Sequence, residues 1–105
     1  MTDNVLVLTT AGSEAEARNI ANQLVERRVV ACVNMIPRIQ SVYRWEGKVE
    51  TAEEFLLIIK TTKARSANVQ AAIRQLHSYD LPECIVISIE DGSAEYLKWI
   101  EESVG

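Results

Sequence analysis

The stretch that decides the fold is VVACVNMIPRIQSVYRWEGKVETAEEFLLIIKTTK, residues 29–63, because it consists of two extended runs that meet at Glu46 and Gly47. In the first run apolar side chains alternate with polar ones, which gives a strand one apolar and one polar face. That apolar face is expected to hold Val33, Met35, Ile39, Tyr43 and Trp45. In the second run, residues 48–54 are mostly polar and residues 55–59 are apolar throughout. We therefore predict a β-hairpin whose second strand begins in a solvated environment and ends in a core.

The length of this hairpin is informative, because each arm has room for about 14 residues against the usual roughly 3–10. At about 3.3 Å per residue an arm reaches roughly 45 Å, whereas a domain of this size has a radius of gyration of about 13 Å. The tip should therefore overhang its domain and present Tyr43 and Trp45 to a partner. The alternative is a pair of shorter arms with a bend at Pro37, since proline belongs on edge strands or at bulges. For Glu46 and Gly47 we expect a type I turn with a glycine bulge.

Composition places the chain among ordinary globular proteins. Its 105 residues fit one domain, residues 1–105, with 48% hydrophobic and 25% charged residues. The net charge of −4 argues against non-specific binding to nucleic acid. No apolar run approaches the ~20 residues of a membrane span, and the amino terminus has no basic leader. We therefore expect a cytoplasmic protein in which Cys32 and Cys84 are free thiols.

Short patterned segments flank the hairpin. Residues 4–9 are expected to form a buried strand, and a helix follows in which Ser13 and Glu16 make a reciprocal capping box. The apolar face of that helix is Ala17, Ile20, Ala21, Leu24 and Val25. A second helix is expected from about residues 62–64 to residue 77, a buried strand over residues 84–89, and a last helix with Ser93 as its N-cap.

The resulting order, β-α-β-β-α-β and a final helix, predicts an α+β protein with the ferredoxin-like sandwich plan. In that plan both main helices cover one face of an antiparallel sheet, and the first hairpin strand lies on an edge, where Pro37 is tolerated. The second hairpin strand is central, and residues 84–89 form the opposite edge. Apolar edges are aggregation hazards unless another chain covers them, so we expect a closed homo-oligomer.

The sequence lacks the common catalytic signatures, and we expect no enzyme. Metal ligands are a stronger possibility, because His77, Asp80, Glu83 and Cys84 lie within eight residues and offer nitrogen, oxygen and sulfur donors. Imidazole and thiolate suit copper and zinc. We therefore single out His77 and Cys84 as ligands of a weakly bound Cu²⁺ or Zn²⁺ ion. The alternative for Cys84 is a small core residue at the start of a strand.

A second candidate site uses the hairpin. Tyr43 and Trp45 can stack on a ligand or anchor an interface. Lys60, which closes the apolar run of the second strand, is either a solvated strand end or an anion-binding charge in a cleft between subunits. The adjacent Glu53 and Glu54 point to opposite faces of a strand and form no carboxylate dyad.

Several motifs occur in order along the chain: residues 31–34 (ACVN), Pro37, S-x-Y-x-W-x-G at residues 41–47, Glu54, residues 60–62 (KTT), H-x-Y-x-x-P-E at residues 77–83, and G-x-x-x-Y-x-x-W-I at residues 92–100. With this set the chain resembles the CutA family of divalent-cation tolerance proteins. The resemblance covers nearly the whole sequence. It implies a ferredoxin-like protomer, a stable homotrimer similar in assembly to the PII signalling proteins, a cytoplasmic location and an association with copper tolerance.

The resemblance to the family implies one metal ligand in this chain. Some family members have a cysteine in the first strand and a pair of histidines before the tyrosine, and the matching positions here are Thr9 and Leu76-His77. Only His77 carries over. The first hypothesis is therefore a trimeric, non-enzymatic protein that binds a divalent cation weakly. The second is a PII-like signalling or scaffold trimer whose clefts, lined by Tyr43, Trp45 and Lys60, bind a small anion or a partner protein.

Overall fold

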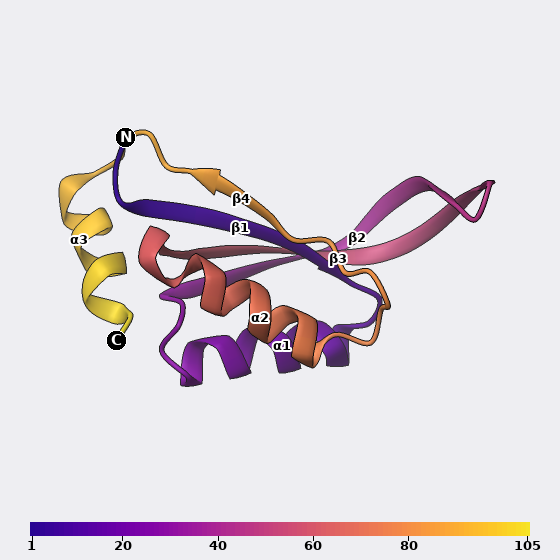
Figure 1. Ribbon diagram of the computed structural model, residues 1–105, viewed down its shortest axis with the longest axis horizontal. Helices are drawn as coiled ribbons and strands as arrows, with labels where there is room; N and C mark the ends of the chain where they lie inside the picture. Colours follow the sequence, from indigo (N-terminus) through magenta and orange to yellow (C-terminus); the bar gives the residue numbers. More distant parts are fainter.

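The computed structural model describes residues 1–105 and shows a four-stranded antiparallel sheet with two helices on one face and a third helix at one end (Figure 1). The strands are β1 (Asn4–Ala11), β2 (Cys32–Trp45), β3 (Lys48–Thr62) and β4 (Ile85–Ser88). The helices are α1 (Glu14–Glu26), the short 3-10 helix η1 (Lys63–Arg65), α2 (Ser66–Leu76) and α3 (Ala94–Ser103). This element order confirms the α+β class and the β-α-β-β-α-β plan.

The strand order in the sheet is β2-β3-β1-β4. The predicted placement is therefore confirmed: β2 and β4 are the two edges, and β3 is central beside β1. Pro37 lies on an edge, where its missing N–H costs no ladder hydrogen bond. β3 pairs with β1 over Phe55–Thr62 and with β2 over Lys48–Lys60. The part of β3 that precedes Phe55 thus has a neighbour on one side only.

The core lies between the sheet and the pair α1 and α2. Alternate residues of β1 and β3 point towards these helices, and Val7, Leu57 and Ile59 are fully buried there. The helices contribute apolar side chains at helical spacing: Ala17, Ile20, Leu24, Val69, Ala72 and Ile73. One expected core residue is wrong, because Val25 is 44% exposed. It lies near the end of α1, where the helix reaches the border of the core.

The hairpin of β2 and β3 extends well beyond the rest of the sheet (Figure 1). Its strands have 14 and 15 residues, and the longest dimension of the molecule is 44 Å. Long arms and a bend at Pro37 were the two alternatives predicted for the hairpin. The structure has the long arms, and it also has an irregularity near Pro37. The register shifts between Ile36 and Ile39, where Arg38 adopts a φ of 60°. Two residues of β2 there oppose one of β3, which is a β-bulge.

This bulge corrects the single apolar face expected for β2. Before it, Val33 and Met35 pair with Ile59 and Leu57 and point to the helices. After it, Ile39 pairs with Glu54, so the extra residue has exchanged the two faces. Tyr43 and Trp45 consequently share the helix-free face of the hairpin.

The turn at the tip also differs from the expectation. Glu46 and Gly47 both have positive φ values, 50° and 80°, and Trp45 pairs directly with Lys48. Positive φ at both central residues defines a type I′ turn, so a type I turn with a glycine bulge is wrong. The primed turn has the twist that two long paired strands require, and it forces Glu46 into a conformation that L-residues adopt reluctantly.

The helix-free face of the sheet is apolar. By register it carries Leu6, Leu8, Ile36, Leu56, Ile58, Ile85 and Ile87. The expectation that the last strand is buried is wrong for one chain, because the side chains of Ile85, Val86 and Ile87 are 40–50% exposed. The strand lies on the sheet edge and has only β1 as a neighbour. No helix in the chain is long and apolar enough to span a bilayer.

The positive φ values at the tip predict opposite effects of two substitutions. Glu46→Asn should raise the midpoint of urea unfolding, because asparagine tolerates the left-handed region and Asn-Gly is the preferred type I′ pair. Gly47→Ala should lower it, with a loss of about 1 kcal/mol, because an L-residue is strained at a φ of 80°. The midpoints are measured at one chain concentration. Equal midpoints for Gly47→Ala and the wild type would contradict the turn assignment.

Candidate functional site beside the hairpin

The only histidine, His77, is held by two hydrogen bonds at the C-terminal end of α2. Its Nε2 lies 2.6 Å from the carbonyl oxygen of Thr10, and its Nδ1 lies 3.1 Å from the backbone N of Tyr79. A carbonyl oxygen only accepts, so Nε2 donates to Thr10 and Nδ1 accepts from Tyr79. Both ring nitrogens are therefore already engaged in hydrogen bonds. Because the residue is only 9% exposed, its role here is to fasten the end of α2 to β1.

The carboxylate of Glu16 fastens the same segment from the other side. The capping box is confirmed in one half only: the hydroxyl of Ser13 accepts from the N–H of Glu16 at 3.2 Å. Glu16 does not complete the box, because its Oε2 accepts from the backbone N–H of Ser78 at 2.8 Å and lies 3.9 Å from Nδ1 of His77. A long-range hydrogen bond has replaced the predicted local one. It fixes residues 77–79 against the start of α1.

Tyr79 connects this segment to the hairpin. Its hydroxyl donates to Oε2 of Glu54 at 2.8 Å, and its ring lies 4.5 Å from the His77 ring, centroid to centroid. Burial, and then the hydrogen bond to the Glu54 carboxylate, raise the pKa of Tyr79 to about 12. Gly12 makes room for the hydroxyl, since a Cβ at residue 12 would lie 2.9 Å from it.

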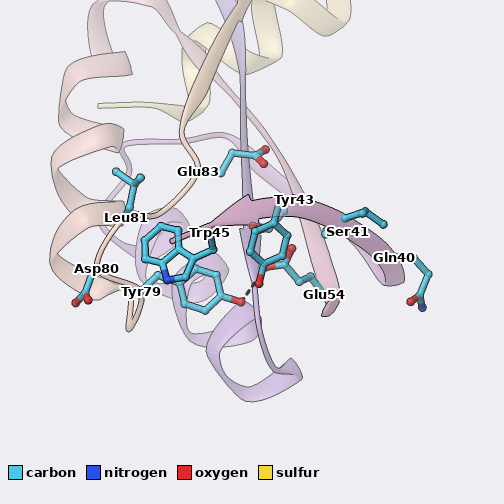
Figure 2. Close-up of a pocket in the computed structure, with 11 residues that line it drawn as sticks. Gln40, Ser41, Tyr43, Trp45, Glu54, Tyr79, Asp80, Leu81 and Glu83 are labelled. Carbon is cyan, nitrogen blue, oxygen red and sulfur yellow. Dashed lines mark hydrogen bonds between the residues drawn. The ribbon is translucent and has the colours of Figure 1, made fainter. Parts of the chain in front are cut away.

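Tyr79 and the hairpin border a hollow of about 700 Å³. Three aromatic side chains line it, those of Tyr43, Trp45 and Tyr79, and Figure 2 shows their rings gathered beside Glu54. Three acidic residues also line it: Glu54, Asp80 and Glu83. The remaining lining residues are neutral: Thr10, Gln40, Ser41, Val42 and Leu81. The hollow is therefore aromatic and acidic, and no Lys, Arg or His lines it.

The acidic residues of the hollow influence one another's ionisation. Burial, and then repulsion from Glu54, raise the pKa of the Glu83 carboxyl above its ordinary value. Glu54 itself is 7% exposed, and neither of the two ion pairs of the chain includes it. In contrast, its neighbour Glu53 is exposed on the other face of β3. The two acids thus form no dyad, as predicted from their alternation.

The three residues of the predicted cleft do not meet within one chain. Tyr43 and Trp45 line the hollow, but Lys60 borders a separate depression beside α3. There its Nζ lies 3.2 Å from the hydroxyl of Tyr96 and 5.3 Å from the centroid of the Tyr96 ring. A cleft that combines all three side chains requires Lys60 from another subunit, and it stays a prediction.

The predicted metal ligands do not form a metal centre in this geometry. Both His77 nitrogens are used, and no group of three or more His, Cys, Asp and Glu side chains is gathered closely enough to hold an ion. Cys84 is a free, half-buried thiol that packs against the core, and Cys32 is also free. Burial raises the pKa of the Cys84 thiol, which disfavours the thiolate that binds metals. The ligand assignment of His77 and Cys84 stays a prediction.

Sequence reasoning missed the roles of Glu54 and Tyr79. Glu54 is the residue of β3 that precedes the apolar run, and a carboxylate at the entry of a core is a signal that could have been used. The bond from Tyr79 to Glu54 spans 25 residues, and no local pattern indicates it.

The sequence model of the family described as CutA1 divalent ion tolerance protein matches residues 5–103. The chain belongs to this CutA1 family. A divalent-cation tolerance protein CutA from Thermus thermophilus is 43% identical over 100 residues, which cover 95% of this chain and 97% of that protein.

Two further CutA proteins are relevant to location. The solved structure of a periplasmic divalent cation tolerance protein CutA from Archaeoglobus fulgidus superposes with a TM-score of 0.94 at 42% identity, covering 97% of this chain and 99% of that one. A chloroplastic CutA protein from Arabidopsis thaliana is 39% identical over 100 residues, which cover 95% of this chain but only 55% of that protein. CutA relatives therefore occupy more than one compartment.

Glu16 generates a pH prediction. Burial opposes its ionisation, but hydrogen bonds from Ser78, the electrostatic contribution of His77 and a bond from Gly12 together outweigh it, so the pKa of Glu16 lies below its ordinary value of 4.5. A depressed pKa in the fold contributes stability that is present above pH 4.5 and is lost as the pH falls through the folded value.

Glu16→Gln should therefore be less stable than the wild type at pH 7, and the difference should shrink below pH 4.5. Urea unfolding at a series of pH values measures it. Glu14→Gln is the matched control, because Glu14 lies in the same helical turn and pairs only with the exposed Arg18. A stability difference that stays constant with pH would contradict the role given to Glu16.

Proposed function

We propose that this CutA1 protein is a cytoplasmic homotrimer that serves in divalent-cation tolerance without catalysing a reaction. Membership of the CutA1 family supports the tolerance role. The observation that supports the assembly is the uncovered apolar surface of the sheet. Leu8, Leu56 and Ile58 lie on the face opposite α1 and α2, and Ile85–Ile87 on the edge are half-exposed. A surface of this kind marks an interface.

The shape of the chain favours a ring. The two edges of the sheet differ, since β2 is long and ends in an overhanging tip whereas β4 has four residues. Contact between unlike edges of successive copies is heterologous, and such contacts form a ring when the rotation between copies closes. Exposed apolar side chains on both arms of the tip, Val42 and Val49, suit a position against a neighbouring copy. Three copies is the number that the family resemblance implies.

Sedimentation equilibrium tests the trimer. The wild type should have three times the chain mass of 11.8 kDa. Ile87→Lys should shift the mass towards that of one chain, because it places an unpaired charge on the uncovered face. Lys98→Glu changes an exposed residue of α3 and serves as the control. A wild-type mass of one chain overturns the proposal.

The metal part of the proposal is weak binding of a divalent cation, Cu²⁺ or Zn²⁺, with His77 and Cys84 as the side chains to test. The contacts argue for weakness. His77 offers a nitrogen only after it releases Thr10 or Tyr79, and the loss of such a buried hydrogen bond costs about 1–3 kcal/mol. Cys84 must lose its proton in a half-buried place.

Calorimetric titration with Cu²⁺ and with Zn²⁺ measures this binding. The wild type should bind weakly, and His77→Gln and Cys84→Ser should each bind more weakly still. His77→Gln is used because glutamine can still donate to Thr10. Cys32→Ser is the matched control, since Cys32 is also free and half-buried. Identical curves for wild type, His77→Gln and Cys84→Ser would remove both ligands from the proposal.

A further inference from the structure

Within its own chain, Glu54 is a buried carboxylate without a countercharge. It is 7% exposed, and the hydroxyl of Tyr79 is its only hydrogen-bonding partner. Neither ion pair of the chain includes it. Charged side chains are rarely buried this far unless a partner of opposite charge neutralises them. Because Glu54 lines the hollow, the natural position of such a partner is inside the hollow.

The rings around Glu54 show what kind of cation fits. Tyr43, Trp45 and Tyr79 line the same hollow, and Figure 2 shows their rings beside the Glu54 carboxylate, whereas Asp80 and Gln40 point away from the rings. Aromatic faces attract cations, and the attraction is strongest for cations that are weakly hydrated. The hollow of about 700 Å³ lies in the size range of small-molecule sites.

Other classes of ligand fit less well. Within one chain, a small anion would meet Glu54, Asp80 and Glu83 with no Lys, Arg or His in the lining. A bare divalent ion needs several oxygen donors close together, and no group of three acidic, His or Cys side chains provides them. Only a cation with an apolar shell uses both the carboxylate and the aromatic rings.

We propose that this hollow binds an organic cation, a quaternary or alkylated ammonium group, whose charge faces Glu54 and whose carbon atoms pack against Tyr43, Trp45 and Tyr79. The site is distinct from His77 and Cys84, which do not line the hollow. It also uses a different chemistry from the weak inorganic-cation binding proposed above. Lys48 of the hairpin pairs across the strands with Trp45 but lies outside the lining.

Nuclear magnetic resonance of the full-length protein tests the proposal, with tetramethylammonium as the probe and sodium chloride to hold ionic strength constant. The chain has two tryptophans, so its spectrum has two indole N–H signals, from Trp45 and Trp99. Tetramethylammonium should shift the Trp45 signal along a saturable curve and leave the Trp99 signal, from α3, in place. tert-Butyl alcohol, which is neutral and similar in shape, should shift Trp45 only weakly and without saturation.

Two variants separate the carboxylate from its surroundings. Glu54→Gln should weaken binding of tetramethylammonium about tenfold, because it removes the charge but keeps an oxygen that accepts from Tyr79. Glu53→Gln, its neighbour on the opposite face of β3, should bind like the wild type. An unchanged Trp99 signal in each variant shows that the fold is retained.

Three results would overturn the proposal. One is the absence of a saturable Trp45 shift with tetramethylammonium in the wild type. Another is equal affinity of the wild type and Glu54→Gln. The third is a Trp45 shift of the same size with magnesium chloride, which would make the hollow a simple carboxylate site in which the rings take no part. None of these results depends on copper or zinc binding at His77, so the two proposals fail separately.

Discussion

The structure depends on the double pairing of β3. Its second half, from Phe55 onwards, is bonded to β1 and to β2, and its first half is bonded to β2 alone. The sequence changes at the same place, from a polar run to an apolar one. The apolar half of β3 is therefore the half that pairs on both sides within the sheet. The polar half is the one that extends into solvent with β2 as its only neighbour. One strand thus forms the centre of the core and one arm of the overhang.

Glu54 lies at the boundary between these two halves. It is the last residue of β3 before the pairing with β1 begins at Phe55. A side chain at that position is close enough to the sheet to be buried, yet it borders the space under the overhang. The bulge at Pro37 and Arg38 directs Tyr43 and Trp45 to the same side. The aromatic and acidic lining of the hollow thus follows from two features: the pairing of β3 with β1 stops at Phe55, and β2 has an extra residue at its bulge.

Much of the fold could be predicted from local patterns. Periodicity and apolar runs located the three α-helices and four strands but not the short helix η1, and the length of the hairpin predicted its overhang. What failed was decided at single residues by contacts outside the pattern. Alternation could not show that the bulge reverses the faces of β2, so Tyr43 and Val33 were wrongly placed on one face. The turn type depended on strand twist, which gave Glu46 a positive φ.

The site was less predictable, because its hydrogen bonds are long-range. Nearness in sequence grouped His77 with Asp80, Glu83 and Cys84 as donors for a metal. In the fold, His77 instead bonds to Thr10, 67 residues away, and Ser78 bonds to Glu16, 62 residues away. Side-chain chemistry alone cannot distinguish a histidine that is free to bind a metal from one whose nitrogens are both engaged. That distinction requires knowing the hydrogen-bond partners of the ring, here Thr10 and Tyr79.

These long-range bonds also give the hollow two unlike walls. The wall that bears Tyr79 is fastened to the core, since Glu16, His77 and Thr10 hold residues 77–79 in place. The wall that bears Tyr43 and Trp45 belongs to a hairpin whose outer half contacts no other strand of its own chain. Two-stranded ribbons gain little stability by themselves, so packing at the tip sets the position of that wall. In a trimer, the surface of the neighbouring copy that contacts the tip would therefore also set the width of the hollow. Assembly and ligand binding would then both depend on the position of the hairpin.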